Sequence, residues 1–96
     1  MKKGYWVVAY RSISDEAALK EYSKLAVPAI DAGGGKILIR ATNVESHESG
    51  LNQLVVVVEF ESLEKASATY RSAAYKAALK ALGSAAERDF RIVEGR

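Results

Sequence analysis

The sequence predicts an α+β fold of the ferredoxin-like type, β-α-β-β-α-β, in a single domain over residues 1–96. Runs rich in aromatic and β-branched residues alternate with segments whose apolar residues recur at helical spacing. The chain also repeats itself: shifted by 48 positions, Val7 falls on Val55, Ser14 on Ser62 and Tyr22 on Tyr70. Two such βαβ units with right-handed crossovers give a four-stranded antiparallel sheet of order 4-1-3-2, with both helices on one face.

The first half of the chain predicts a strand followed by a helix. Residues 5–12 are apolar on both alternating faces, so this strand is predicted to be covered on both sides. Ser14 is the predicted N-cap of the helix, and the glycines 33–35 stop it. The same glycines do not suggest a phosphate loop, which would follow a strand and open a helix. Pro28 is predicted to end or kink the helix near residues 25–27, with a further turn after it.

The remaining elements follow from the same signals. Ser62 and Ser72 are both placed to cap a helix, so the second helix is predicted to restart at Ser72 and run to Gly83. A polar loop separates the second and third strands, and the third strand is the strongest in the chain. The second strand is predicted at residues 36–42, and the loop at 43–52. The third strand is predicted at 53–61, and the fourth at 88–94.

Apolar residues on both faces of the first and third strands predict a homodimer. Both helices cover one side of the sheet, which leaves the other side bare. Exposing its Val, Leu and aromatic side chains would forfeit roughly 1.5–3 kcal/mol for each one. We therefore expect two copies to pack their open faces together in an isologous two-fold contact. The alternative is a monomer with an amphipathic sheet.

Composition excludes several classes of function. The chain has no cysteine and one histidine, so disulfides, thiol catalysis and a zinc or iron centre are not expected, and no cofactor is expected. The net charge is +2 and the signs are interspersed, so no nucleic-acid partner is expected. No apolar stretch reaches the ~20 residues of a membrane span, and no signal peptide is indicated. A cytoplasmic location is the default expectation.

Two strand residues and three further side chains are the candidates for a site. Arg40 and Glu59 each lie in an apolar strand, and the two strands are neighbours in the predicted hairpin. In one interpretation Arg40 binds a carboxylate or another anion, and Glu59 acts as acid/base or orients Arg40. In the other they form a cross-strand ion pair at the rim of the barrel. Tyr75 is expected to line a cleft between helices and sheet, and Tyr5 and His47 complete the candidate ligand-binding set, although a lone loop histidine is usually solvated.

Several motifs in their order and spacing resemble the domain of unknown function family numbered 1330. They are GYW near the start, PAI at 28–30, GGK at 34–36, Arg40, the valine run ending in EF at 59–60, Ser72 with Tyr75 three residues later, and VEG at 93–95. The resemblance covers nearly the whole chain. It implies the ferredoxin-like fold of the dimeric α/β-barrel superfamily, with a dimer whose sheets face each other. It implies no established activity, since that superfamily includes cofactor-independent monooxygenases, haem-degrading enzymes, isomerases and simple ligand binders.

Two functional hypotheses remain open. The first is a protein that binds a small aromatic or carboxylate molecule in the helix–sheet cleft, with a weak cofactor-independent oxygenase or isomerase activity suggested by the resemblance alone. The second is a non-catalytic dimerisation or interaction module. In either case Tyr22, Tyr70 and Trp6 are interpreted as packing residues. RNA binding through the sheet would require exposed aromatic and basic residues on the central strands, which the third strand lacks.

Overall fold

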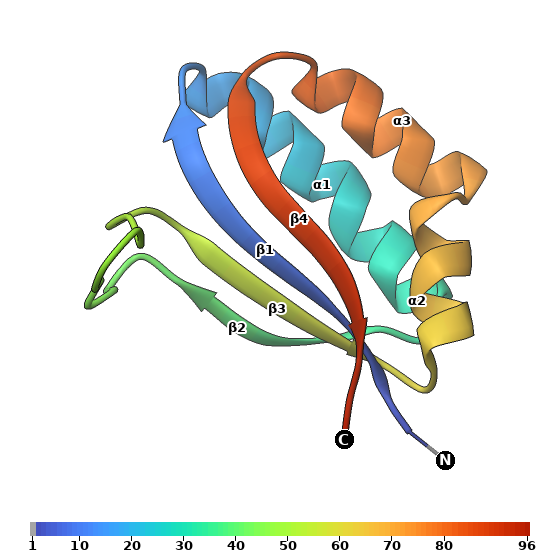
Figure 1. Cartoon of the computed structure of the whole chain (residues 1–96). Coiled ribbons are helices and arrows are strands. Elements are labelled where there is room, and N and C mark those ends of the chain that lie inside the picture. Colours follow the sequence, from blue (N-terminus) through green and yellow to red (C-terminus); the bar gives the residue numbers. More distant parts are fainter. Residues whose placement is uncertain (1) are drawn as a thin grey trace.

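The computed structural model describes residues 2–96 as one antiparallel sheet with all its helices on one face (Figure 1). The strand order β2-β3-β1-β4 is the predicted order read from the opposite edge. The elements are β1 (Gly4–Ile13), α1 (Glu16–Ala32), β2 (Lys36–Ala41), β3 (Val55–Phe60), α2 (Leu63–Tyr70), α3 (Ala73–Leu82) and β4 (Ala86–Glu94). No helix within residues 2–96 combines the length and the hydropathy needed to cross a membrane.

The start of α1 differs by one residue from the prediction. Asp15, not Ser14, is the N-cap, and its carboxylate accepts a hydrogen bond from the backbone N–H of Ala18 at 3.1 Å. The Ser14 hydroxyl instead donates to the carbonyl oxygen of Ala85, also at 3.1 Å. Ser14 therefore ties the end of β1 to the turn before β4.

The predicted end of the helix near residues 25–27 is wrong, because α1 continues through Pro28 to Ala32. Pro28 is exposed, so the carbonyl group that loses its helical hydrogen bond can bind water instead. The neighbouring Ala26, Ala29 and Ile30 are buried against the core and hold the helix in place on both sides of the proline. Tertiary packing outweighs the local preference here.

The predicted restart of the second helix at Ser72 is confirmed. The Ser62 hydroxyl accepts from the backbone N–H of Lys65 at 3.1 Å and caps α2. The Ser72 hydroxyl accepts from the N–H of Tyr75 at 3.2 Å and caps α3. α3 ends before Gly83, whose φ of 55° favours glycine.

The core lies between the sheet and the helices and is centred on Trp6. This side chain is 1% exposed, and its indole N–H donates to the carbonyl oxygen of Ala66 at 2.9 Å. Its ring centroid lies 4.8 Å from that of Tyr75, 5.0 Å from Phe60 and 5.2 Å from Phe90. Trp6 is thus the core residue at which α2, α3 and three strands meet.

A bulge in β2 decides which of its side chains face the helices. Ile37 pairs with Val58, but the next pair is Ile39 with Val57, so Leu38 is the extra residue. An inserted residue moves the following side chains to the opposite face of the sheet. Arg40, which pairs with Val56, therefore lies on the helix-covered face.

Candidate functional site

A cavity of about 60 Å³ lies between α1 and the helix-covered face of the sheet. Most of its lining is aliphatic or aromatic. Val27, Ile37 and Arg40 line it and are exposed, so they mark its mouth. The polar side chains that line it are those of Tyr10, Tyr22, Ser23, Arg40 and Arg88. An apolar cleft with a few converging polar groups is the usual form of a small-molecule site.

Arg88 on β4 is the central cation of this cavity. It is half-buried, and its Nη1 donates to the hydroxyl oxygen of Tyr22 at 3.1 Å and to that of Tyr10 at 3.5 Å. Its guanidinium carbon lies 5.0 Å from the ring centroid of Tyr22, 5.5 Å from Tyr10 and 5.2 Å from Phe90. These aromatic faces and phenol oxygens attract the cation, but none of them carries a negative charge at neutral pH.

Arg40 adds a second cation at the mouth of the cavity. Burial raises the pKa of Tyr10, while the nearby charges of Arg88 and Arg40 act in the opposite direction. Both arginines therefore lie close enough to the Tyr10 hydroxyl to act on it electrostatically. The ion pairs within residues 2–96 involve neither Arg40 nor Arg88. The described part of the chain thus supplies no carboxylate partner for either guanidinium.

Tyr75, a candidate from the sequence, lies one side chain behind this cavity. It is fully buried and is absent from the lining, but its hydroxyl oxygen is 2.6 Å from that of Tyr22, which does line the cavity. Burial raises the pKa of the Tyr75 hydroxyl well above its usual range. Tyr75 therefore stays protonated, and its hydroxyl is linked to the cavity through the hydroxyl of Tyr22.

Glu59 and Tyr5 lie on the opposite, open face of the sheet. The Tyr5 hydroxyl donates to Oε2 of Glu59 at 3.0 Å, and in the β2–β3 register Glu59 is opposite Lys36. The predicted contact between Arg40 and Glu59 is therefore wrong, both as a functional pair and as an ion pair. The bulge at Leu38 places Arg40 on the other face, which the sequence pattern did not reveal.

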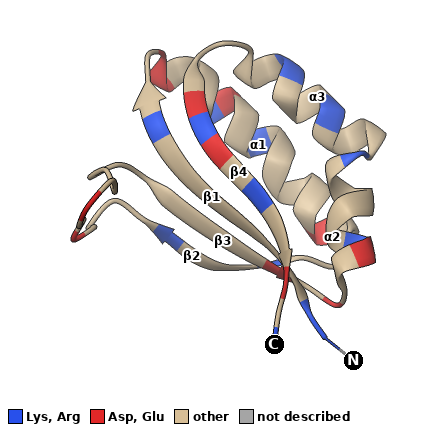
Figure 2. Ribbon diagram, in the orientation of Figure 1, with Lys and Arg blue, Asp and Glu red and all other residues tan. Residues whose placement is uncertain are grey.

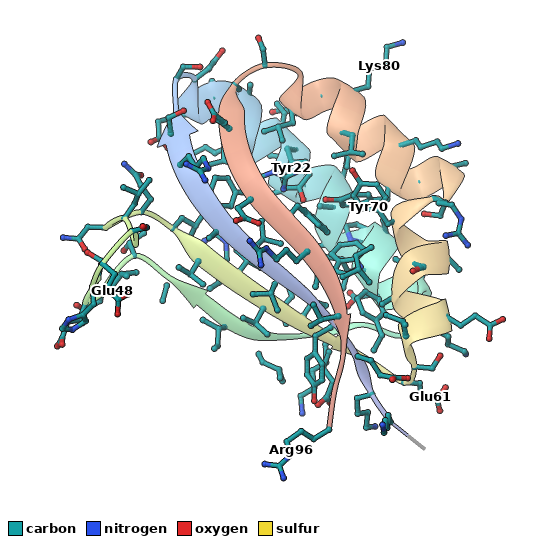
Figure 3. All side chains as sticks on the ribbon, viewed as in Figure 1. Tyr22, Glu48, Glu61, Tyr70, Lys80 and Arg96 are labelled. Atoms are coloured by element: carbon teal, nitrogen blue, oxygen red, sulfur yellow. The ribbon has the colours of Figure 1, made fainter. Side chains whose placement is uncertain are left out.

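His47 is not brought to the cavity either. It lies in the loop between β2 and β3, near Glu48, which Figure 3 labels at the far end of that loop. Its side chain is exposed, and Nε2 is 2.7 Å from Oε2 of Glu45. Within residues 2–96, no three His, Cys, Asp or Glu side chains are grouped so that they could hold a metal ion.

Sequence reasoning missed the roles of Arg88, Tyr10 and Tyr22. Charged residues of both signs follow one another along β4, so no single residue stands out (Figure 2). The alternation of side chains along β4 could have identified Arg88. Phe90 and Ile92 point toward the core, and Arg88, two residues before Phe90, points to the same face. The cavity thus brings together Arg40 from the predicted set with three residues outside it.

Comparisons with known proteins agree with this fold. The family of the domain of unknown function DUF1330 matches residues 3–96. No protein with a curated description is similar in sequence. A protein of unknown function from Rhodopseudomonas palustris has 19% identity and a TM-score of 0.72, covering 97% of this chain and 80% of its own. A protein proposed to be an antibiotic biosynthesis monooxygenase from Caulobacter crescentus has 15% identity and a TM-score of 0.61. The match covers 99% of this chain and 92% of the Caulobacter chain.

A third solved structure extends the same likeness. A NIPSNAP family protein of unknown function from Agrobacterium tumefaciens has 17% identity and a TM-score of 0.55, covering 96% of this chain and 86% of its own. The shared architecture is the ferredoxin-like fold of the dimeric α/β-barrel proteins. Identities this low establish the fold and not the chemistry.

Proposed function

The chain belongs to the DUF1330 family, which has no assigned function, and we propose from its cavity that it binds a small carboxylate compound between α1 and the sheet. The observation that carries the proposal is the pair of guanidinium groups, Arg40 and Arg88, that face one cavity without a carboxylate from the described chain. A partly desolvated cation is stabilised by an anion. Guanidinium groups also match the planar geometry of a carboxylate.

The size of the cavity narrows the class of ligand. A dry cavity of roughly 150 Å³ accommodates benzene, whereas this cavity measures about 60 Å³. It therefore suits a carboxylate head group with a short aliphatic chain better than a whole aromatic ring. A larger compound would keep its ring at the mouth, beside Val27 and Ile37.

The same proposal includes a homodimer formed through the open face of the sheet. Val7, Val55 and Val57 lie on that face, and Val93 and Ile39 there are 39% and 46% exposed. Single exposed apolar residues are ordinary, but a contiguous set of them favours an interface. The resemblance to the dimeric α/β-barrel superfamily, which implies a dimer whose sheets face each other, supports the same arrangement.

Fold likeness alone supports a reaction class for the bound compound. The Caulobacter protein is proposed to be a monooxygenase, which supports oxygenation. Cofactor-independent oxygenation and isomerisation come from the family resemblance alone. The alternative, a non-catalytic interaction module, requires a cavity that binds no small molecule. Binding of a small molecule therefore distinguishes the two functions.

The test is a titration of ¹⁵N-labelled protein with sodium propionate and, separately, with propionamide, at constant ionic strength. We expect propionate to shift the amide signals of Tyr10 and Val56 saturably, and we expect propionamide, which is uncharged and of similar shape, to leave them unmoved. Arg88→Met should weaken propionate binding roughly tenfold or more, since hydrogen bonds to charged groups contribute about 1.5–3 kcal/mol.

Two further variants make the result specific. Arg40→Met changes an exposed side chain, so it keeps the fold and should also weaken binding. Arg91→Met is the matched control, because Arg91 lies on the open face and pairs with Asp89. Equal binding of acid and amide, no binding of either, or an equal loss in Arg91→Met would each refute the proposal.

A further inference from the structure

We infer that Tyr22 donates a hydrogen bond to the bound carboxylate, and that Tyr75 is the positioning residue that keeps the Tyr22 proton available for it. The inference rests on the proposed carboxylate binding and adds a specificity-determining residue to that site. Its basis is the pair of hydroxyl groups beneath Arg88. Their two oxygens are 2.6 Å apart, and this distance alone does not say which one donates.

Hydrogen-bond accounting fixes the direction. A phenol has one proton to donate and two lone pairs to accept with. Tyr75 is fully buried, and within residues 2–96 the Tyr22 oxygen is the one acceptor in hydrogen-bond contact with its hydroxyl. The Arg88 guanidinium also acts on the Tyr75 hydroxyl, but it can only donate. If Tyr22 donated, the Tyr75 proton would be buried without an acceptor, which is strongly unfavourable. Tyr75 therefore donates to Tyr22.

Arg88 completes the set of donors around the Tyr22 oxygen. Its Nη1 donates to that oxygen at 3.1 Å, so the arginine and Tyr75 together use both lone pairs. The Tyr22 proton then has no acceptor among the described side chains, and Tyr22, unlike Tyr75, lines the cavity. Two donors to one hydroxyl also polarise it and strengthen its own donation. The proton is thus directed to an acceptor atom of the guest.

The cavity consequently offers donors from Arg40, Arg88 and Tyr22 at once. A carboxylate presents two acceptor oxygens and satisfies these donors, whereas a primary amide presents an NH₂ group that would oppose one of them. Tyr22 therefore adds to the discrimination between acid and amide, over and above the charge of the arginines. Its direction is set by a residue that never contacts the ligand.

The second half of the chain supplies a matched control. Tyr70 occupies the position equivalent to Tyr22 in the internal repeat, at the end of α2, and Figure 3 labels both side chains. Its hydroxyl has no hydrogen bond within residues 2–96, and its ring packs 5.0 Å from Phe90 and 5.3 Å from Tyr75. Removing the Tyr70 hydroxyl leaves the cavity and its donors unchanged.

The experiment measures propionate dissociation constants for Tyr22→Phe, Tyr75→Phe, the double variant and Tyr70→Phe. We expect Tyr22→Phe to lose roughly tenfold or more, and Tyr75→Phe to lose a few-fold because it acts only through Tyr22. The double variant should then bind no more weakly than Tyr22→Phe, and Tyr70→Phe should bind as wild type does. Binding by Tyr22→Phe at wild-type affinity, or additive losses in the double variant, would overturn the inference.

A spectroscopic readout separates positioning from general structure. In the ligand-free protein we expect one slowly exchanging hydroxyl proton, that of Tyr75, and a second from Tyr22 only when propionate is added, each assigned by selective tyrosine labelling. A slowly exchanging Tyr22 proton that is already bonded to Tyr75 without ligand would overturn the inference while leaving carboxylate binding intact. Failure of the wild type to bind propionate would instead defeat the proposed function and the ligand role of Tyr22 with it.

Discussion

The two faces of the sheet treat their charged and polar side chains differently. On the open face Arg91 makes two hydrogen bonds to Asp89, at 2.9 and 3.2 Å, and Tyr5 donates to Glu59 at 3.0 Å. On the helix-covered face, within residues 2–96, the hydrogen bonds of Arg88 go to tyrosine hydroxyls, and its guanidinium also lies over aromatic rings. These open-face groups thus find their partners in one another, whereas Arg88 on the covered face has no carboxylate partner within residues 2–96. An anionic ligand gains most binding energy beside a cation that has no anionic partner in the protein. The comparison therefore favours the covered face as the binding site.

The largest expected difference between the faces concerns stability. Replacing Trp6 by Ala removes the central ring of the covered face and its hydrogen bond to Ala66, and should lower the free energy of unfolding by about 3–5 kcal/mol. Val7→Ala, the adjacent residue on the open face, should cost much less within one subunit. Urea denaturation at a fixed protein concentration measures both. Equal losses would mean that the two faces contribute equally to the core.

The next expected effect concerns assembly. Val57→Asp places a charge in the middle of the open face and should raise the dimer dissociation constant roughly 100-fold or more, because each copy would bury an unpaired carboxylate. Sedimentation equilibrium measures it. Leu25→Asp is the control, since Leu25 is 43% exposed on α1 and lies outside the open face. A wild-type chain that sediments as a monomer at micromolar concentration would remove the interface from the account.

A smaller effect should appear at alkaline pH on the covered face. Burial raises the pKa of Tyr75 above its ordinary value of 10.0. The unfolded chain therefore ionises first, so the stability is fully present below about pH 10 and declines as the pH rises further. We expect Tyr75→Phe to flatten this decline in urea denaturation at pH 8, 10 and 11. An unchanged alkaline slope would show that the buried hydroxyl does not couple to folding.

The smallest expected effect belongs to the open face at acid pH. The hydrogen bond from Arg91 lowers the pKa of Asp89 below its ordinary value of 3.8. The stability that this pair contributes is present above that value and is lost as the pH falls below it. Because the pair is exposed in the single subunit, Asp89→Asn made in the monomeric Val57→Asp variant should change the acid unfolding midpoint only slightly, and added salt should reduce even that. A large shift in that variant would mean that the pair contributes to the fold of one subunit.

The fold could be predicted because its signals are local and repeated. The strand runs and the serine caps at residues 62 and 72 each depend on neighbouring residues, and the 48-residue repeat shows the same signals twice. The helix end predicted before Pro28 does not occur because packing of Ala26 and Ile30 outweighs the lost hydrogen bond. A local preference is a reliable guide only where tertiary contacts do not oppose it.

The site could be predicted only in part because its geometry is not local. Arg40 was identified as a cation in an apolar strand, but the bulge at Leu38 that turns it toward the cavity leaves no mark in the sequence pattern. Tyr22 and Tyr70 occupy equivalent positions in the repeat, so the sequence favours the same packing role for both. What separates the two tyrosines is Arg88, which is 66 residues from Tyr22 in the chain and lies against it in the fold.

The most direct test of the central claim locates the guest on one face or the other. With a filtered NOE experiment, protonated propionate is mixed with protein that carries ¹³C-labelled valine and isoleucine methyl groups. The account predicts NOEs from propionate to the methyl groups of Val56 and Ile30, which line the cavity. NOEs to Val7 and Val57 on the open face, without any to Val56 or Ile30, would contradict it.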